Sequence, residues 1–187
     1  MNLYAKLQAR AADNQPIRIG VIGAGKFASM YLAQVPKTPG IHLVGIADLV
    51  PDNAKRNLAR GGWQSDRYSA ASVEQALAHG TTHVGDDWLA LVKHPAIDVI
   101  VEATGSPIAA VDHCLGAFTH GKHVVNVTVE ADALCGPMLG KRARDAGVIY
   151  SLAYGDQPAL VCDLVDWARA AGFNVVSAGR GHKWLPE

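Results

Sequence analysis

Short apolar runs alternate with stretches of helical periodicity along most of the chain. The apolar runs contain many β-branched residues and no regular polar face, which is typical of strands buried on both sides of a sheet. The segments that we predict as strands on this basis are 17–22, 41–47, 97–102, 123–127, 148–153 and 173–178.

Between these runs the chain carries the start and stop signals of helices. Pro16 ends a first amphipathic segment, Gly172 lies just beyond the last one, and Pro137 is well placed for a first helical turn. Ser72 and Gln75 have the spacing of a capping box, which predicts a short helix at that point. The other predicted helices are 3–13, 27–34, 52–60, 88–93, 108–120, 137–146 and 159–171. Strands that alternate with helices predict an α/β fold with a mostly parallel sheet.

Composition and charge exclude several classes of protein. The chain has 187 residues, which is enough for one domain and part of a second. Hydrophobic residues make up 49% and charged residues 18%, which excludes a disordered chain. The 17 basic and 17 acidic residues sum to zero, so we expect no nucleic-acid partner. So few and so balanced charges give little self-repulsion, and we expect either a partner that covers part of the surface or a larger protein.

The cysteines and the N-terminal residues bear on the compartment. Cys114, Cys135 and Cys162 form no paired pattern, which indicates reduced thiols of a cytoplasmic protein. The first residues have no signal-peptide pattern, and no apolar run approaches the ~18 residues that a membrane span needs. We therefore expect a cytoplasmic protein with no membrane partner.

The first chemical signal is the segment GVIGAGKFA at 20–28, which lies directly between a predicted strand and a predicted helix. It contains the G-x-G-x-x-A pattern of dinucleotide-binding loops, in which the first glycine permits a tight turn and the second lets backbone approach a pyrophosphate. Ala28 then allows the helix to pack closely on the strand. In this context the pattern favours a Rossmann-type doubly wound fold over another glycine-rich turn. The cofactor contacts expected from it are Gly23, Ala24, Gly25, Lys26 and Phe27.

Asp48 ends the second predicted strand, twenty residues after Ala28. A carboxylate at this place accepts hydrogen bonds from the ribose hydroxyls of adenosine and repels a 2′-phosphate. Taken alone, Asp48 favours NAD over NADP. Lys55 and Arg56 follow on the next helix and leave NADP open, because either side chain can reach towards a phosphate.

The second signal is the segment VEATGSP at 101–107, which ends another strand. In doubly wound sheets the ligand lies outside the carboxyl ends of the strands, near the point where the strand order reverses. Thr104, Gly105 and Ser106 are small and polar, and we expect them to contact the cofactor. The alternative is an ordinary turn from strand to helix.

Together with GKHVV at 121–125, these segments resemble the NAD(P)-binding domain of the homoserine-dehydrogenase type, shared loosely with the glucose-fructose oxidoreductase group. The resemblance covers about residues 15–187. More narrowly, YSLAYGDQPAL at 150–160 and AGRGHKWLPE at 178–187 resemble a bacterial subgroup with a C-terminal SAF-like domain. That subgroup includes enzymes similar to deoxyxylulose-phosphate reductoisomerase, and this likeness implies NADPH.

The chain departs from both larger families after GKHVV. Those families place a lysine near the hydride-transfer centre in this segment, whereas here it reads Asn126-Val-Thr-Val-Glu130 and the next lysine is Lys141. Plain homoserine dehydrogenase or sugar dehydrogenase activity is therefore not expected. We expect Asn126 to contact the cofactor. Glu130, in what the sequence suggests is an acidic loop, is either a catalytic carboxylate or an acid at a helix start.

Two further candidates lie towards the C-terminus. Asp156 in the segment Tyr154–Pro158 is either a helix cap or a catalytic carboxylate, and Lys183 belongs to a cationic cluster with Arg180 and His182 that suits a substrate phosphate or carboxylate. With Glu130, these residues are the catalytic candidates.

The histidines give no metal prediction. His113, His120 and His123 are close in sequence, but their spacing matches no zinc pattern.

The function that we predict is that of an NAD(P)-dependent oxidoreductase, which moves hydride between nicotinamide and a carbonyl or alcohol of a small polar metabolite. Residues 1–154 are expected to form the dinucleotide-binding domain, with a short N-terminal helix. Residues 155–187 are expected to form a helix and a strand leading to a substrate domain outside this chain, so that this chain alone is inactive. The alternatives are an NADPH-dependent phosphosugar reductoisomerase and a nucleotide-binding sensor without turnover. The expected partners are a small-molecule substrate and, for a full-length protein, further copies in a homo-oligomer.

Overall fold

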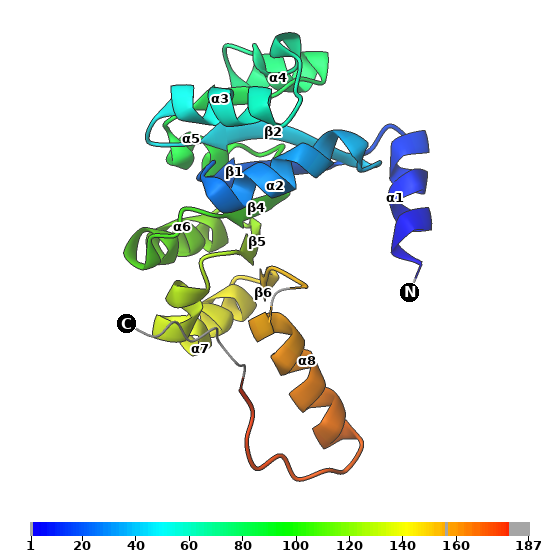
Figure 1. Ribbon diagram of the computed structural model, residues 1–187, viewed down its shortest axis with the longest axis vertical. Coiled ribbons are helices and arrows are strands. Elements are labelled where there is room, and N and C mark those ends of the chain that lie inside the picture. The colour runs from blue at the N-terminus through cyan, green and yellow to red at the C-terminus, as the bar shows by residue number, and fades with distance from the viewer. Residues whose placement is uncertain (1, 156, 180–187) are drawn as a thin grey trace, which may run out of the picture.

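All the strands in the described part of the chain lie in one parallel sheet (Figure 1). The computed structural model describes residues 2–155 and 157–179, and within them the sheet has six strands in the order β3-β2-β1-β4-β5-β6. Every neighbouring pair is parallel. The strands are β1 (Ile17–Ile22), β2 (Ile41–Ala47), β3 (His83–Gly85), β4 (Val99–Glu102), β5 (His123–Asn126) and β6 (Tyr150–Leu152). The order reverses between β1 and β4, as in the doubly wound dinucleotide-binding fold that the sequence predicts.

The helices are α1 (Leu3–Ala12), α2 (Lys26–Gln34), α3 (Pro51–Arg60), α4 (Val73–His79), α5 (Trp88–Lys93), α6 (Pro107–Thr119), α7 (Val129–Asp145) and α8 (Gln157–Ala170). Helices α2 to α7 lie in the connections between consecutive strands and cover both faces of the sheet, whereas α1 precedes β1 and α8 follows β6. Two short 3₁₀ turns, Val35–Lys37 and Ser65–Tyr68, complete the described elements. The predicted capping residue Ser72 is the side-chain N-cap of α4, and Asp87 is the side-chain N-cap of α5.

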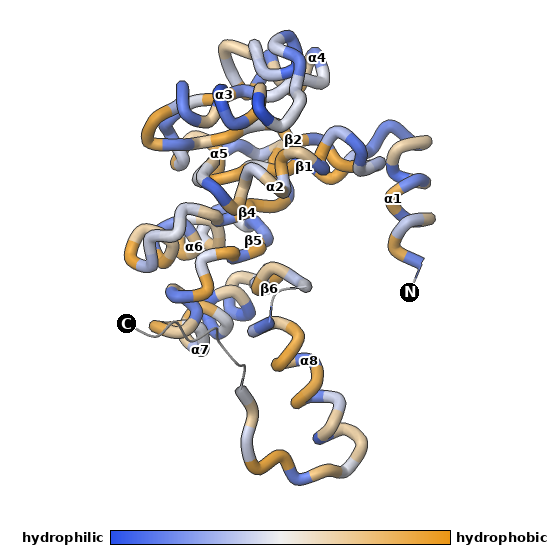
Figure 2. Tube along the Cα trace, viewed as in Figure 1, coloured by the Kyte–Doolittle hydropathy of each residue, from blue (hydrophilic) through white to orange (hydrophobic). Residues whose placement is uncertain are grey.

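The core consists of two apolar layers, one on each face of the sheet. Val21 points into the layer made with α2 and α3, where Leu32 and Leu58 are buried. Ile22 points into the opposite layer, which α4, α5, α6 and α7 cover. Because alternate residues of β1 enter different layers, the strand is apolar on both sides. Figure 2 shows the hydrophobic residues of the central strands between more polar helices.

Two strand predictions need correction. The sequence reading missed β3, which has only three residues, starts at a histidine and is held by parallel pairing with β2. The predicted strand at 173–178 is wrong, because these residues have no strand structure and most of them are exposed. An apolar β-branched run forms a strand only where a partner supplies the ladder of hydrogen bonds.

The start of α7 also differs from the prediction. The helix begins at Val129, in the segment that the sequence suggested as a loop, and is interrupted at Cys135, whose φ of −148° and ψ of 25° are not helical. Pro137 lies two residues beyond the interruption. Its missing N–H therefore falls in the first turn of the second half, which was the place predicted for it.

The last described helix, α8, makes few contacts with the rest of the fold. It follows β6 and extends away from the sheet (Figure 1), and none of its residues is buried. Its exposed apolar residues Leu160, Leu164 and Trp167 follow the spacing of one helical face. No helix among the described residues is long and apolar enough to cross a membrane.

Two helical glycines give a test of the packing. A Cβ at Gly116 of α6 would lie 2.8 Å from the Trp88 ring, whereas a Cβ at Gly140 of α7 would meet only Arg144 at 3.6 Å. Gly116→Ala is expected to lower the free energy of unfolding by ~1–3 kcal/mol, because the half-buried indole of Trp88 has to move. Gly140→Ala, the matched control, is expected to raise it by about 0.5–1 kcal/mol. Urea unfolding measures both, and equal stabilisation by the two variants would contradict this packing.

Candidate dinucleotide-binding site

The loop between β1 and α2 can form only with glycine at its first position. Gly23 has a φ of +89°, and a Cβ there would lie 2.8 Å from backbone atoms of Ala103 and Thr104. Both the left-handed backbone and the close approach to the end of β4 exclude a side chain. Gly23 therefore brings the first loop against the loop that follows β4.

Gly25 is needed for a different reason. It is the N-cap of α2, it has an ordinary negative φ, and a Cβ there would have no neighbour within 4 Å. Open space above this residue faces the first-turn N–H groups of α2, which have no intrahelical partner. Such a helix start binds anions. Lys26 and Phe27 are exposed in the first turn, and Ala28 is buried against β1, as predicted.

Asp48 follows β2 and ties two loops together. Its Oδ2 accepts a hydrogen bond of 2.8 Å from the N–H of Ala24, and its Oδ1 accepts one of 2.9 Å from the N–H of Val50. The amide of Asn57 on α3 donates to the carbonyl of Ala24 at 2.7 Å. The N–H and the carbonyl of Ala24 are therefore both hydrogen-bonded, which holds the glycine loop in position. Each Asp48 oxygen keeps a lone pair for a ligand.

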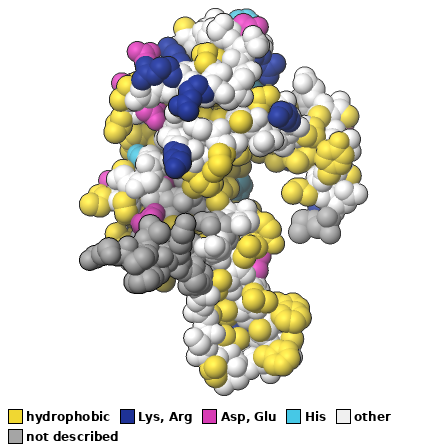
Figure 3. Space-filling view, in the orientation of Figure 1, with side chains coloured by type: hydrophobic (Ala, Val, Ile, Leu, Met, Phe, Trp, Pro, Cys, Tyr) yellow, Lys and Arg dark blue, Asp and Glu magenta, His cyan; other side chains and the backbone are white. Residues whose placement is uncertain are grey.

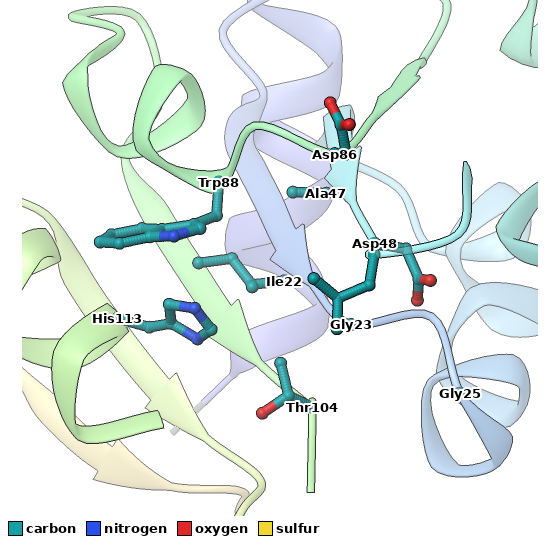
Figure 4. Close-up of a pocket in the computed structure, with 10 residues that line it drawn as sticks. Ile22, Gly23, Gly25, Ala47, Asp48, Asp86, Trp88, Thr104 and His113 are labelled. Carbon is teal, nitrogen blue, oxygen red and sulfur yellow. The ribbon is translucent and has the colours of Figure 1, made fainter. Parts of the chain in front are cut away.

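A cleft of about 170 Å³ lies at the point where the strand order reverses, between the ends of β1 and β4 (Figure 4). The predicted residues Gly23, Gly25, Asp48 and Thr104 line it. Its other lining residues were not predicted and are Ile22, Ala47, Leu49, Asp86, Trp88 and His113. In the sequence, Asp86 and Trp88 stand out only because they lie at the start of the predicted helix 88–93.

His113 and Trp88 meet in this cleft although α5 and α6 are separate elements. Their ring centroids are 4.7 Å apart with the planes tilted by 60°. Nδ1 of His113 lies 3.2 Å from Oε1 of Glu102, the last residue of β4. Glu102 is fully buried, with 0% of its surface exposed. A carboxylate in such a place has to be compensated by hydrogen-bond donors.

The donors to Glu102 come from the loops that follow β4 and β5. Thr104 donates its hydroxyl to Oε1 at 2.6 Å and its backbone N–H to the same atom at 3.3 Å. The hydroxyl of Thr128 donates to Oε2 and accepts from the N–H of Gly105 at 3.0 Å. One buried carboxylate thus fixes the two loops next to the cleft.

Asn126 extends this network to β6. Its side chain accepts from the N–H of Thr128 and donates to the hydroxyl of Tyr150, which in turn donates to Asp132 on α7. Burial raises the pKa of Tyr150 well above its usual range. Asn126 is itself fully buried. Its expected contact with a cofactor stays a prediction, and in this structure it supports the loops.

Glu130, Gly105 and Ser106 are not among the residues that line the cleft. Glu130 is exposed in the first turn of α7, where its charge suits the helix dipole. Gly105 and Ser106 are exposed in the loop after β4. Asp156 and Lys183 lie outside the described residues, and their catalytic roles stay predictions.

The histidines considered for a metal have separate partners. His120 bonds the carbonyl of Gly116 and His123 accepts from the N–H of Ile149, while His113 faces Glu102. Among residues 2–155 and 157–179, no three His, Cys, Asp or Glu side chains gather as they would around a metal ion.

A second cleft of about 460 Å³ adjoins Asp48 on the outer side of the glycine loop. Asn53, Asn57, Arg56 and Arg60 of α3 line it together with Asp48. Figure 3 shows the basic side chains over α2 and α3. Arg56 is held by Asn53. The lining of this second cleft therefore combines one carboxylate, that of Asp48, with the guanidinium groups of Arg56 and Arg60.

The comparisons agree with this geometry. Residues 20–152 match the family described as the NAD-binding domain of homoserine dehydrogenase. The match covers most of the chain, so the protein belongs to this family of NAD-binding oxidoreductase domains. Residues 155–187 match a second family, the catalytic domain of oxidoreductase DRL. No curated protein matches the chain.

Solved structures with the same fold are considerably longer. A homoserine dehydrogenase from Thiobacillus denitrificans has a TM-score of 0.57 at 20% identity, over 73% of this chain and 29% of that one. A Synechocystis biliverdin reductase, solved with biliverdin and NADP+, has a TM-score of 0.53 at 23% identity, over 74% of this chain and 38% of that one. An NAD-binding oxidoreductase from Klebsiella pneumoniae has a TM-score of 0.53 at 21% identity, over 84% and 39%. These likenesses confirm the Rossmann-type fold, and this chain spans well under half the length of each of the three.

The buried carboxylate gives the second test. Glu102→Gln places an amide N–H₂ where donors converge, and is expected to lower the free energy of unfolding by ~1–3 kcal/mol. The same substitution at the exposed Glu130 is expected to change it by less than about 0.5 kcal/mol. Urea unfolding at neutral pH compares them, and a Glu102→Gln protein as stable as the wild type would show that the network is not needed.

Proposed function

We propose that the protein is the cofactor-binding part of an NAD(P)-dependent oxidoreductase that transfers hydride to or from a carbonyl or alcohol of a small polar metabolite. The observation that carries this proposal is the cleft where the strand order reverses, which Gly23, Asp48 and Thr104 line together. In doubly wound sheets this is where a dinucleotide crosses from one half of the fold to the other.

The residues present fit a nicotinamide dinucleotide. The open face of Gly25 and the unpaired N–H groups at the start of α2 suit a pyrophosphate. Asp48 suits the hydroxyls of the adenosine ribose. We assign contact with the second ribose to Thr104 and Gly105, which are held through Glu102 and Thr128. The bound nicotinamide supplies the hydride chemistry, and the chain supplies its position.

We propose NAD as the preferred cofactor. A carboxylate after the second strand of this fold repels a 2′-phosphate, and two hydrogen bonds to backbone hold Asp48 in position after β2. The opposing influence is Arg56 with Arg60, which line the adjoining cleft and attract a phosphate. We assign the larger effect to Asp48 because it lines both clefts.

We propose that the group that exchanges a proton with the substrate is Glu130, Asp156 or Lys183. Glu130 follows β5 at the carboxyl end of the sheet, where substrates meet the cofactor in this fold. Asp156 and Lys183 belong to the segment that matches the catalytic domain of oxidoreductase DRL. A lysine there would donate a proton and a carboxylate would accept one.

Gly25→Ala tests cofactor binding separately from folding. Because a Cβ at Gly25 meets no atom of the protein within 4 Å, the thermal unfolding midpoint is expected to remain within a few degrees of wild type. The methyl group would occupy the space of the pyrophosphate, so the affinity for NADH is expected to fall at least about tenfold, or ~1.4 kcal/mol. NADH fluorescence titration measures the affinity. Unchanged affinity would move the pyrophosphate away from this loop.

A pair of substitutions tests the preference for NAD. Asp48→Asn removes the charge but keeps an acceptor for one of the two backbone N–H groups, and is expected to shift the ratio of NADH to NADPH affinity about tenfold towards NADPH. Arg56→Gln is expected to weaken NADPH and leave NADH unchanged. Titrating both variants with both cofactors gives the ratios. If Asp48→Asn weakened both cofactors equally, its role would be to hold the loop and not to choose the cofactor.

A further inference from the structure

The hydrogen bonds around Glu102 determine which of its neighbours carry protons. The Thr104 hydroxyl accepts from the N–H of Ser106 at 3.2 Å, so its own hydrogen is directed at Oε1. The Thr128 hydroxyl accepts from the N–H of Gly105, so its hydrogen is directed at Oε2. Each carboxylate oxygen therefore already accepts a hydroxyl hydrogen. Both oxygens of Glu102 therefore act as acceptors towards their neighbours.

The acceptor Oε1 of Glu102 sets the tautomer of His113. A carboxylate only accepts, so the Nδ1 atom of His113, 3.2 Å from Oε1, carries the hydrogen. In the neutral imidazole Nε2 is then an acceptor. Among the described residues no hydrogen-bond partner is found for this nitrogen, while its ring lines the cleft between Trp88 and Thr104 (Figure 4).

The carboxylates that line the cleft lie on the side formed by the ends of β2 and β3. Asp48 is the residue to which the proposed function assigns the adenosine ribose. Asp86 also lines the cleft. Ile22, Leu49 and Trp88 supply apolar surface of the kind that a purine ring needs. A purine attached to a ribose at Asp48 would therefore meet acceptors at its edge, which suits an exocyclic amino group and disfavours a carbonyl oxygen.

We propose that His113, held in one tautomer by Glu102, is a binding residue that accepts a hydrogen bond from the amino group of adenine. The inference rests on the proposed function and adds the base specificity of the same site. It assigns Glu102 as a positioning residue, which acts on the ligand through His113. The ligand class is a dinucleotide with a 6-aminopurine, and its hypoxanthine analogue is the ligand that the site rejects.

The test compares NADH with reduced nicotinamide hypoxanthine dinucleotide, in which a carbonyl replaces the adenine amino group. The full chain is titrated with each, following the nicotinamide fluorescence. Wild type is expected to bind NADH at least about tenfold more tightly, because the carbonyl would face the Nε2 lone pair. His113→Gln is expected to bring the ratio close to one, because a glutamine amide can present either a donor or an acceptor. His120→Gln, at the C-cap of the same helix, is the control and is expected to keep the wild-type ratio.

Nitrogen NMR of histidine-labelled wild type provides a measurement that needs no variant. The spectrum is expected to show His113 with hydrogen on Nδ1 and a bare Nε2, whose resonance moves upfield when NADH binds. Glu102→Gln is expected to mix the tautomers and lower the preference for NADH over the hypoxanthine analogue.

The outcomes are distinguishable. Equal binding of the two dinucleotides by wild type, or a preference that survives in His113→Gln, overturns this inference and leaves the proposed function standing. Failure of wild type to bind either dinucleotide overturns both.

Discussion

A charge without access to water has to be compensated within the protein, and the buried carboxylate at the end of β4 imposes that requirement on everything around it. Removing a carboxylate from water costs several kcal/mol unless donors replace the lost hydration. Glu102 obtains its donors from Thr104, Thr128 and His113, so the loops after β4 and β5 and one face of α6 adopt positions that serve it. The shape of the cleft follows from this arrangement.

On the other side of the cleft, the constraint is steric. Gly23 lies so close to the backbone of Ala103 that the first loop and the loop after β4 are in direct contact. Asp48 and Asn57 then hold the backbone of Ala24 from two elements. A site for a flexible dinucleotide benefits from such rigidity, because groups that are already in place lose little entropy on binding.

The sequence predicted those features that depend on neighbours along the chain. The glycine loop, Asp48 and most element bounds come from local signals such as caps, prolines and apolar runs. Glu102 was hidden because a carboxylate inside an apolar strand has no local signature, and its partners Thr128 and His113 are brought to it by the fold. The strand prediction for 173–178 was wrong for the converse reason. Its composition is strand-like, but no strand among the described residues pairs with it.

The double anchoring of Asp48 means that the two ends of the adenosine diphosphate half are not recognised independently. The carboxylate that would receive the ribose also holds the N–H of Ala24, which belongs to the loop that would receive the pyrophosphate. A ribose bound by Asp48 would act on the phosphate loop through this hydrogen bond, and a phosphate bound by the loop would act on Asp48 in the same way. By thermodynamic linkage each fragment would change the binding of the other to the same degree. The affinity of the whole half-cofactor would then differ from what its separate fragments suggest.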